Sequence, residues 1–304
     1  MSGRVFYADE FLLPLPPGHR FPMAKYRLLR ERVVASGIVP PQSLRVPEAA
    51  TDAQLTTVHD PRYVAAVATG ALTPQAQRRI GFPWSPGMVE RSRRSAGATL
   101  AACRAALATG AGVSLAGGTH HAGIDRGEGY CVFNDAAVAI RVLQREGAIA
   151  RALVVDTDVH QGNGTAAVFQ EDDAVFTLDL YAERNFPFEK VPCDLAVALP
   201  DGTGDAVYLE RLEQALREAL RRSSPDLAIY VSGADPFEGD RLGRLALTKR
   251  GLETRDRLVL SMLRAAGIPV GVTMAGGYAA EVGDTVEIHW ATVRATLGTG
   301  AGEE

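Results

Sequence analysis

Asp158 and His160, separated by one residue, are the most informative feature of this sequence because both side chains can bind a metal ion. They follow the apolar segment 152–156, whose composition predicts a buried strand. In an extended backbone, residues i and i+2 point to the same side, so the carboxylate and the imidazole can reach one ion. Oxygen beside nitrogen suits a divalent metal, zinc in particular. Taken alone, the pair is equally compatible with a helix N-cap followed by a solvated histidine.

Three other predicted strands are also followed by residues that could do chemistry. Gly117-Gly-Thr-His-His121 follows one strand, Ser232-Gly-Ala-Asp235 follows another, and Ala275-Gly-Gly-Tyr278 follows a third. The carboxyl ends of parallel strands are where open α/β sheets bind their ligands. Each turn could be purely structural, but four such ends carrying His, Asp and Tyr together indicate one active site.

Hydrophobic patterning predicts the elements that must position these residues. Continuously apolar runs predict strands over 5–7, 112–116, 152–156, 174–180, 227–232 and 269–274, and amphipathic stretches predict helices near 22–36, 87–109, 134–146, 162–171, 205–222, 249–266 and 283–296. Runs that are apolar throughout indicate strands covered on both faces, hence a mostly parallel sheet. No linker or repeat divides the sequence, so we expect a single domain over 1–304, with a frayed tail over 298–304 and a surface loop over 181–204.

Composition limits the class of function. The net charge of -4 gives no electrostatic basis for direct binding of nucleic acid or of an acidic membrane surface. No apolar run is long enough to cross a membrane, and the N-terminus has no apolar signal core. Three scattered cysteines do not make a disulfide framework or a CxxC metal site. These features predict a protein of the reducing cytoplasm.

Taken together, the motifs resemble those of the zinc-dependent histone deacetylases of the arginase-deacetylase superfamily, and most closely the bacterial members near class IV. The resemblance runs from His19 to Tyr278 and is carried by the segments 117–121, 127–135, 156–164, 233–243 and 276–278. It implies an α/β fold, in which a single three-layer domain holds a mostly parallel sheet of about eight strands with helices on both faces.

The resemblance also implies the metal and the reaction. Asp158, His160 and Asp235 match the family's zinc ligands, and three protein ligands with one open position are typical of a catalytic zinc. We therefore expect a zinc-dependent amidohydrolase that removes acetyl or longer acyl groups from lysine side chains by means of metal-activated water.

Five residues match the family's catalytic positions. They are His120, His121, Asp156, Asn163 and Tyr278. By resemblance, Asp156 orients His120, His121 is the general base, and the hydroxyl of Tyr278 donates to the developing oxyanion. Asn163 departs from the commoner pattern, in which an Asp accompanies the second His. A neutral amide orients imidazole without stabilising imidazolium, so we expect His121 to hold its proton less tightly and the pH optimum to move downward.

Four residues match the positions that contact substrate in relatives. Gly129 and Tyr130 match the walls of the acyl-lysine tunnel, Cys131 its floor, and Leu242 its rim. Polyamine deacetylases carry a glutamate at the rim position. Leucine offers no carboxylate to a second cationic amine, which favours acyl-lysine as substrate.

Relatives also bind potassium, and the resemblance implies two such sites here. The first would involve Asp156, Asp158, His160, Asp179 and Leu180, and the second the carbonyls of Phe169, Asp172 and Val175. Asp179 stands where other classes have a serine. No local sequence pattern supports either site independently.

Two alternatives remain open at this point, and a third is disfavoured. The same site could hydrolyse an acetylpolyamine or another small amide, or the protein could bind acyl-lysine without turning it over. Binuclear manganese chemistry is disfavoured because Asp235 has no second Asp two residues away. Asp240 and Arg241 are expected to form an ion pair that braces the zinc-binding loop.

Overall fold

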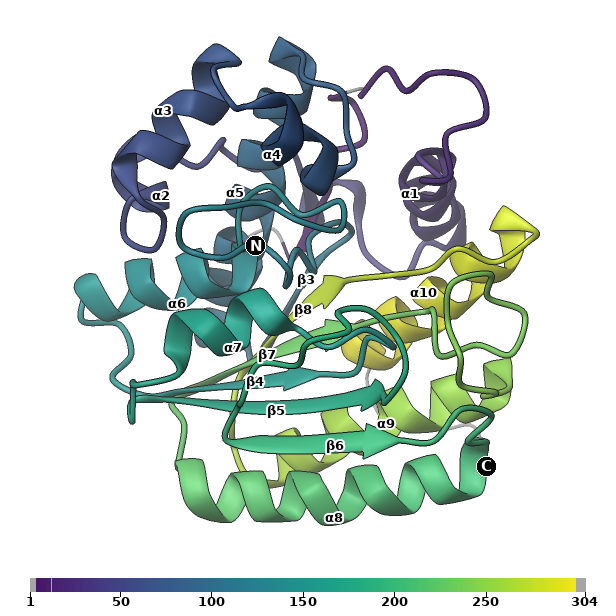
Figure 1. Ribbon diagram of the computed structural model, residues 1–304. Coiled ribbons are helices and arrows are strands. Elements are labelled where there is room, and N and C mark those ends of the chain that lie inside the picture. Colours follow the sequence, from purple (N-terminus) through teal and green to yellow (C-terminus); the bar gives the residue numbers. More distant parts are fainter. Residues whose placement is uncertain (1–3, 12, 299–304) are drawn as a thin grey trace.

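A computed structural model describes residues 4–11 and 13–298, and its centre is one eight-stranded sheet in the order β2-β1-β3-β8-β7-β4-β5-β6 (Figure 1). Every pair of neighbouring strands is parallel. The strands are β1 (Val5–Phe6), β2 (Leu44–Arg45), β3 (Ala111–Ser114), β4 (Ala152–Asp156), β5 (Val175–Ala182), β6 (Leu195–Leu199), β7 (Leu227–Ser232) and β8 (Val270–Met274).

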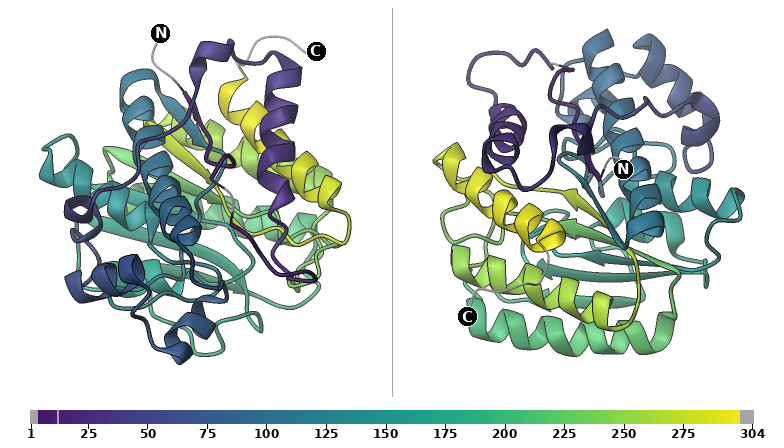
Figure 2. Two further views of the ribbon diagram at one scale, coloured as in Figure 1. Left: turned by 90° about the horizontal axis from the view of Figure 1, so that it is seen from above. Right: turned by 180° about the vertical axis from the view of Figure 1, so that it is seen from behind.

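Helices cover both faces of the sheet. One face carries α1 (Ala24–Ser36), α8 (Asp205–Ser223), α9 (Lys249–Ala265) and α10 (Val282–Leu297), which lie in the row α1-α10-α9-α8 (Figure 2). The other face carries α2 (Asp52–Leu55), α3 (Pro61–Thr69), α4 (Pro74–Ile80), α5 (Pro86–Thr109), α6 (Asp135–Arg145) and α7 (Asn163–Phe169). A short 3-10 helix occupies Pro41–Ser43. No helix in the described ranges is both long and apolar enough to traverse a bilayer.

The residues of β4 show how the sheet supplies two hydrophobic cores. Leu153 and Val155 pack in the cluster beneath α8, α9 and α10, whereas Ala152 and Val154 pack in the cluster beneath α5 and α6. Successive side chains on a strand point to opposite faces, so a strand buried on both sides must be apolar at every position. The predicted parallel sheet between two helical layers is therefore confirmed.

The prediction of an irregular loop over 181–204 was wrong. Strand β5 continues to Ala182, and β6 occupies Leu195–Leu199 at the edge of the sheet. Along β6, exposed Ala196 and Ala198 alternate with buried Val197 and Leu199, so the segment lacks the continuous apolar character of the inner strands. Strand β2 and the helices α2, α3 and α4 were also not predicted. Of the expected tail, Gly298 ends α10 and residues 299–304 lie outside the described residues.

The strand order brings the four predicted functional turns to one edge of the sheet. Strands β3, β8, β7 and β4 are consecutive neighbours, and all four run in the same direction. Their carboxyl ends therefore lie side by side, as the sequence predicted.

Candidate metal centre and active site

Three side chains converge at the carboxyl ends of β4 and β7. The Nδ1 atom of His160 lies 3.0 Å from Oδ1 of Asp158 and 3.2 Å from Oδ2 of Asp235. One ligand atom from each residue lies within 4.8 Å of the others. The i, i+2 spacing of Asp158 and His160 thus places both on the same side, as predicted, and the neighbouring strand supplies the third donor.

Backbone groups hold the two carboxylates in this arrangement. The N–H of Gly276 donates to Oδ2 of Asp158 at 2.7 Å, and the N–H of Val159 donates to Oδ1 of Asp235 at 2.9 Å. A Cβ atom at Gly276 would overlap the carboxylate of Asp235, and one at Gly233 would lie 2.6 Å from the Cα atom of Asp158. Both glycines are therefore required by the close approach of the two turns.

The electrostatics of the cluster suit a cation. Burial and the nearby Asp158 raise the pKa of Asp235 to about 7. Burial disfavours protonation of His160, but the carboxylates of Asp158 and Asp235 outweigh it and raise its pKa to about 10. Two carboxylates packed together away from water are costly unless positive charge accompanies them. Two oxygens and one imidazole nitrogen form a donor set that fits a zinc ion with one position left open.

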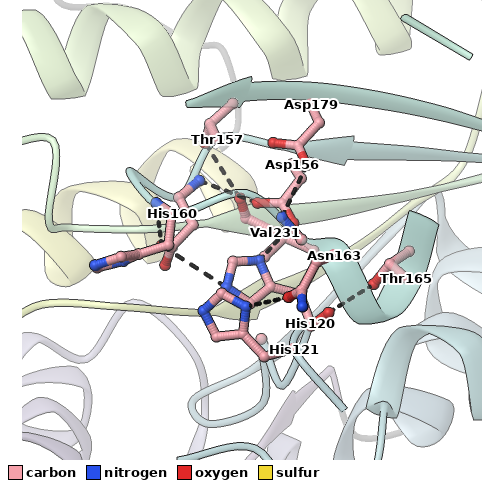
Figure 3. A network of polar contacts seen from close by, with 12 residues as sticks. His120, His121, Asp156, Thr157, His160, Asn163, Thr165, Asp179 and Val231 are labelled. Carbon is pink, nitrogen blue, oxygen red and sulfur yellow. Dashed lines mark hydrogen bonds and ion pairs between the residues drawn. The ribbon is translucent and has the colours of Figure 1, made fainter. Parts of the chain in front are cut away.

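A pair of histidines lies beside this cluster, with ring centroids 4.2 Å apart (Figure 3). The Nδ1 atom of His120 lies 2.7 Å from Oδ2 of Asp156, and the Nδ1 atom of His121 lies 2.7 Å from Oδ1 of Asn163. All four side chains are buried. The structure therefore pairs each histidine with the partner expected from the sequence.

The two rings have opposite preferences for a proton. Burial alone would lower the pKa of His120, but Asp156 and Asp158 outweigh it and raise the pKa to about 10. For His121, burial and the positive charges of His120 and His160 lower the pKa well below its usual value. The surroundings therefore favour the protonated form of His120 and the neutral form of His121.

The sequence did not predict that Asn163 is hydrogen-bonded to Glu128. The Nδ2 atom of Asn163 donates to Oε1 of Glu128 at 3.0 Å, and Nε of Arg79 lies 3.6 Å from Oε2 of the same carboxylate. Because the amide NH₂ faces a carboxylate, the amide oxygen must face His121. Glu128 lies in a motif that was recognised, but no local pattern marks this contact across 35 residues.

Tyr278 lies in the turn after β8 and lines the same small chamber as the cluster. Burial and the carboxylates of Asp235 and Asp158 raise the pKa of its hydroxyl well above the usual value, so the group stays protonated and can donate. Its backbone N–H donates to Oδ2 of Asp240 at 2.6 Å, and its carbonyl accepts from Nε of Arg241 at 3.0 Å.

The expected ion pair between Asp240 and Arg241 was therefore wrong. Asp240 instead accepts backbone N–H groups from Leu242, Gly243 and Tyr278. No ion pair joins Asp240 to Arg241 in the part of the chain that the structure describes. Both side chains tie the turn after β7 to the backbone of Tyr278, which still braces the ligand-bearing turn.

A second residue missed by the sequence reasoning is Lys25 on α1. Its side chain is buried, its Nζ atom donates to the carbonyl of Ala275 at 3.1 Å, and the ammonium lies 5.4 Å from the ring centroid of Tyr278. A cation over an aromatic face is attracted by the ring quadrupole. Lys25 therefore helps to hold the turn that carries Tyr278.

A chamber and an open mouth give access to the cluster. The chamber of about 50 Å³ is lined by both histidines, the three candidate ligands, Tyr278 and Cys131. The mouth of about 880 Å³ is lined by Leu242. Gly129 and Tyr130 line both spaces. Tyr130 has a φ of 67°, an unfavourable conformation for a residue with a side chain, and its N–H donates to the carbonyl of Ile80 at 2.7 Å.

The residues expected to bind potassium fall into two groups. Asp156 and Asp179 are register partners on β4 and β5 and are both buried. Oδ2 of Asp179 accepts from the N–H of Gly162 at 2.8 Å, but its Oδ1 atom has no hydrogen-bond partner within the described part of the chain. Burial and Asp156 raise the pKa of Asp179 well above its usual value.

At the other predicted potassium site, two of the three carbonyl groups expected to bind the ion already accept hydrogen bonds within a turn. The carbonyl of Phe169 accepts from the N–H of Asp172, and the carbonyl of Asp172 accepts from the N–H of Val175. The carboxylate of Asp172 pairs with Arg141 at 2.5 Å. These contacts bring the three residues together without indicating a cation.

The sequence is similar to proteins of one family along most of its length. The family model for the histone deacetylase domain matches residues 19–293. The chain is 45% identical to an uncharacterized protein of Picosynechococcus, covering 95% of this chain and 96% of that protein. It is 31% identical to a histone deacetylase-like amidohydrolase of Pseudomonas aeruginosa, covering 87% of this chain and 73% of that protein.

A solved structure agrees on the fold. The crystal structure of an HDAC homolog complexed with SAHA superposes with a TM-score of 0.85 at 24% identity, covering 100% of this chain and 86% of that one.

Proposed function

The chain belongs to the histone deacetylase family, and we propose that it is a zinc-dependent amidohydrolase that removes acetyl or longer acyl groups from lysine side chains. One observation carries this proposal. Two adjacent buried histidines, whose surroundings shift their pKa values in opposite directions, and three converging metal donors line the same small chamber at the carboxyl ends of neighbouring strands. A general base beside a metal site is the arrangement that amide hydrolysis requires.

Asp158, His160 and Asp235 are the residues that would hold zinc. When bound, zinc polarises the acyl carbonyl and lowers the pKa of water towards ~7. The protein must then supply a group that takes the water's proton and a group that stabilises the oxygen as it becomes negative.

His121 is the proposed general base. Its Nδ1–H donates to Asn163, so its Nε2 atom carries the lone pair and can accept the proton from the attacking water. As the C–N bond breaks, His121 returns this proton to the amine nitrogen of lysine. His120 remains positively charged because of Asp156, and its charge lowers the proton affinity of His121 and favours negative charge on the reacting oxygen.

Tyr278 is the proposed electrophilic donor. Its hydroxyl remains protonated and belongs to a side chain that lines the chamber, where it would donate a hydrogen bond to the acyl oxygen in the transition state. The backbone contacts to Asp240 and Arg241 fix its position before substrate binds. A donor positioned in advance needs no reorganisation during the reaction.

The passage between mouth and chamber supports a slender substrate. Gly129 and Tyr130 line both spaces, so the ring of Tyr130 is available to pack on the methylenes of an acyl-lysine. A Cβ atom at Gly129 would lie 2.7 Å from Cδ2 of His121 and would narrow the passage at the catalytic base. Cys131 would contact the acyl group in the chamber, and Leu242 the substrate at the rim.

Potassium is proposed at the first of the two expected sites. Asp156 and Asp179, with the carbonyls of Asp158, His160 and Leu180, would supply its oxygen ligands. The unpartnered Oδ1 atom of Asp179 supports this, since a buried carboxylate oxygen is costly without a partner. The second site at Phe169, Asp172 and Val175 rests only on resemblance to the family.

The proposal is tested with the purified protein, a fluorogenic acetyl-lysine peptide and a panel of longer acyl-lysine peptides. We expect turnover that stops when a chelator removes the metal and returns when zinc is added, with one zinc per chain by elemental analysis. Acetylspermidine is assayed in parallel, and faster cleavage of it would favour the small-amide alternative. A zinc-loaded protein that binds these peptides without cleaving them would show that the chain only recognises acyl-lysine.

A further inference from the structure

The mouth of the candidate active site is strongly cationic. Five arginines from four parts of the sequence line it, namely Arg20, Arg78, Arg79, Arg184 and Arg244. The acidic side chain that lines the same hollow is Glu128. The chain as a whole has a net charge of -4, so this concentration of positive charge is local and not a property of the whole surface.

Three of these arginines have no acidic partner among the residues that the structure describes. Arg79 faces Glu128 at 3.6 Å, and Arg244 pairs with Asp201 at 3.1 Å. Arg20, Arg78 and Arg184 are exposed, and they form no ion pair within the described ranges 4–11 and 13–298. Three unpaired guanidinium groups around one opening leave a site that an anionic ligand would complement.

We propose that the substrate is an acyl-lysine in an acidic segment of a polypeptide, an inference that rests on the function proposed above. The narrow inner chamber admits the acylated side chain, so the neighbouring residues of the substrate must lie over the mouth. Carboxylates at these neighbouring positions meet the free arginines. Lysine-rich segments and cationic polyamines are repelled by the same charges.

The distribution of the arginines favours a polypeptide over a small anion. Arg78 lies on α4, Arg20 precedes α1, and Arg184 follows β5, so the charges come from three separate parts of the fold. A single small carboxylate can pair with one or two of them and would leave the rest unpaired. An extended segment can pair with several at once. Phe188, whose exposure is 87%, adds apolar surface at the same opening.

Three acetyl-lysine peptides of equal length test this proposal. The residues on either side of the acetyl-lysine are acidic in one peptide, neutral in the second and basic in the third. One exposed ion pair changes affinity by roughly 1.4- to 5-fold. Two or three pairs therefore predict about 10-fold higher kcat/KM for the acidic than for the basic peptide, with the neutral peptide between them. The preference should shrink as salt is added, because the charges are exposed to solvent.

Charge reversal identifies the residues responsible. In the double variant Arg78→Glu and Arg184→Glu, we expect the order of the acidic and basic peptides to reverse. The matched control is Arg145→Glu, which alters an exposed arginine at the last turn of α6. This helix begins at Asp135, which contacts the turn before His120, and ~15 Å of helix separates Arg145 from that end; Arg145 does not line the mouth. The control should keep the preference for the acidic peptide.

The outcomes separate this inference from the proposed function. If all three peptides are cleaved at equal rates, or the basic one is cleaved fastest, the inference is wrong while the deacylase function stands. If flanking charge has no effect and free acetyl-lysine is the best substrate, the site recognises a small molecule and the inference is again wrong. If zinc-loaded protein cleaves no acyl-lysine substrate, the proposed function fails, and this inference with it.

Discussion

The substitution Asn163→Asp tests how the protein sets the proton affinity of its base. Asn163 accepts a hydrogen bond from Nδ1 of His121 and presents a neutral oxygen to it at 2.7 Å. Replacing the amide with a carboxylate of the same shape adds one negative charge next to the imidazole. This charge stabilises the protonated ring, so the pKa of His121 should rise.

The structure shows why the single substitution is not enough. Nδ2 of Asn163 donates to Glu128 at 3.0 Å, so a new carboxylate oxygen at this position would face the existing one. Two adjacent carboxylates share a proton, because like charges raise one of their pKa values. In the single variant Asn163→Asp, the new carboxyl group should therefore be only partly ionised. Combining it with Glu128→Gln provides a donor for the new carboxylate and allows it to carry its full charge.

The expected size of the effect follows from the charge separation. A unit charge roughly 4 Å from another is worth ~4 kcal/mol at an effective dielectric constant of 20. At ~1.4 kcal/mol per unit this corresponds to an upper value of about 3 pKa units. Measured shifts for such neighbours are roughly 1–3 units. His121 must be neutral to accept a proton, so the acidic limb of kcat/KM should move to higher pH by this amount in the double variant.

The assay is a pH–rate profile of kcat/KM between pH 5 and 10, with a neutral acetyl-lysine peptide. It is measured for the parent protein, both single variants and the double variant, and zinc content is checked in each. An acidic limb that stays in place in the double variant would show that His121 is not the base or that Asn163 does not control it. If the acidic limb moves as far in Asn163→Asp alone as in the double variant, Glu128 does not limit the charge at position 163.

Three further substitutions probe other parts of the site. Tyr278→Phe removes one donor to the oxyanion and should lower kcat by roughly 100-fold or more, since one such donor is worth ~2.7–4 kcal/mol. Its zinc content should not change. A variant that loses zinc in proportion to its loss of activity would show that Tyr278 acts in metal binding. Gly276→Ala places a methyl group against the carboxylate of Asp235 and should lower zinc occupancy in elemental analysis, whereas Gly283→Ala, with open space around it, should not. Arg255→Met removes the ion-pair partner of the buried Asp256, which lies 2.8 Å away. In urea denaturation, the free energy of unfolding should fall by about 3–5 kcal/mol. Arg257→Met, which removes the solvent-exposed member of another ion pair of the same helix, should change it by less than about 1 kcal/mol.

The inner strands were predictable because their environment leaves few choices. Ala152–Asp156 and Leu227–Ser232 have the bounds that the apolar runs predicted. A strand covered on both faces must be apolar throughout, and this pattern is visible in the sequence alone. Strand β6 was not predicted because its exposed positions interrupt the continuous apolar pattern. Strand β2 has only two residues and is too short to show such a pattern.

The candidate site was predictable where motifs mark it and not where contacts are remote. The ligand set, both histidines and Tyr278 stand directly after strands, so the sheet order alone brings them together. Glu128 reaches Asn163 across 35 residues, and Lys25 reaches Ala275 across 250. No short-range pattern encodes such contacts, because they depend on how helices and turns pack in three dimensions. Asp240 shows the same limit, since its partners are backbone groups that a sequence does not distinguish.

The remote contacts act mainly on backbone groups, and this explains how the site is held in place. Nη1 of Arg255 donates to the carbonyl of Gly233 at 2.7 Å and to that of Thr157 at 3.3 Å, so one buried guanidinium joins the two ligand-bearing turns. Asp240 joins the turn after β7 to Tyr278 in a similar way. These contacts reinforce the links that the candidate ligands Asp158 and Asp235 already make between neighbouring turns. His121 and Tyr278 both line the chamber, so the proposed base and the proposed oxyanion donor are positioned before substrate arrives.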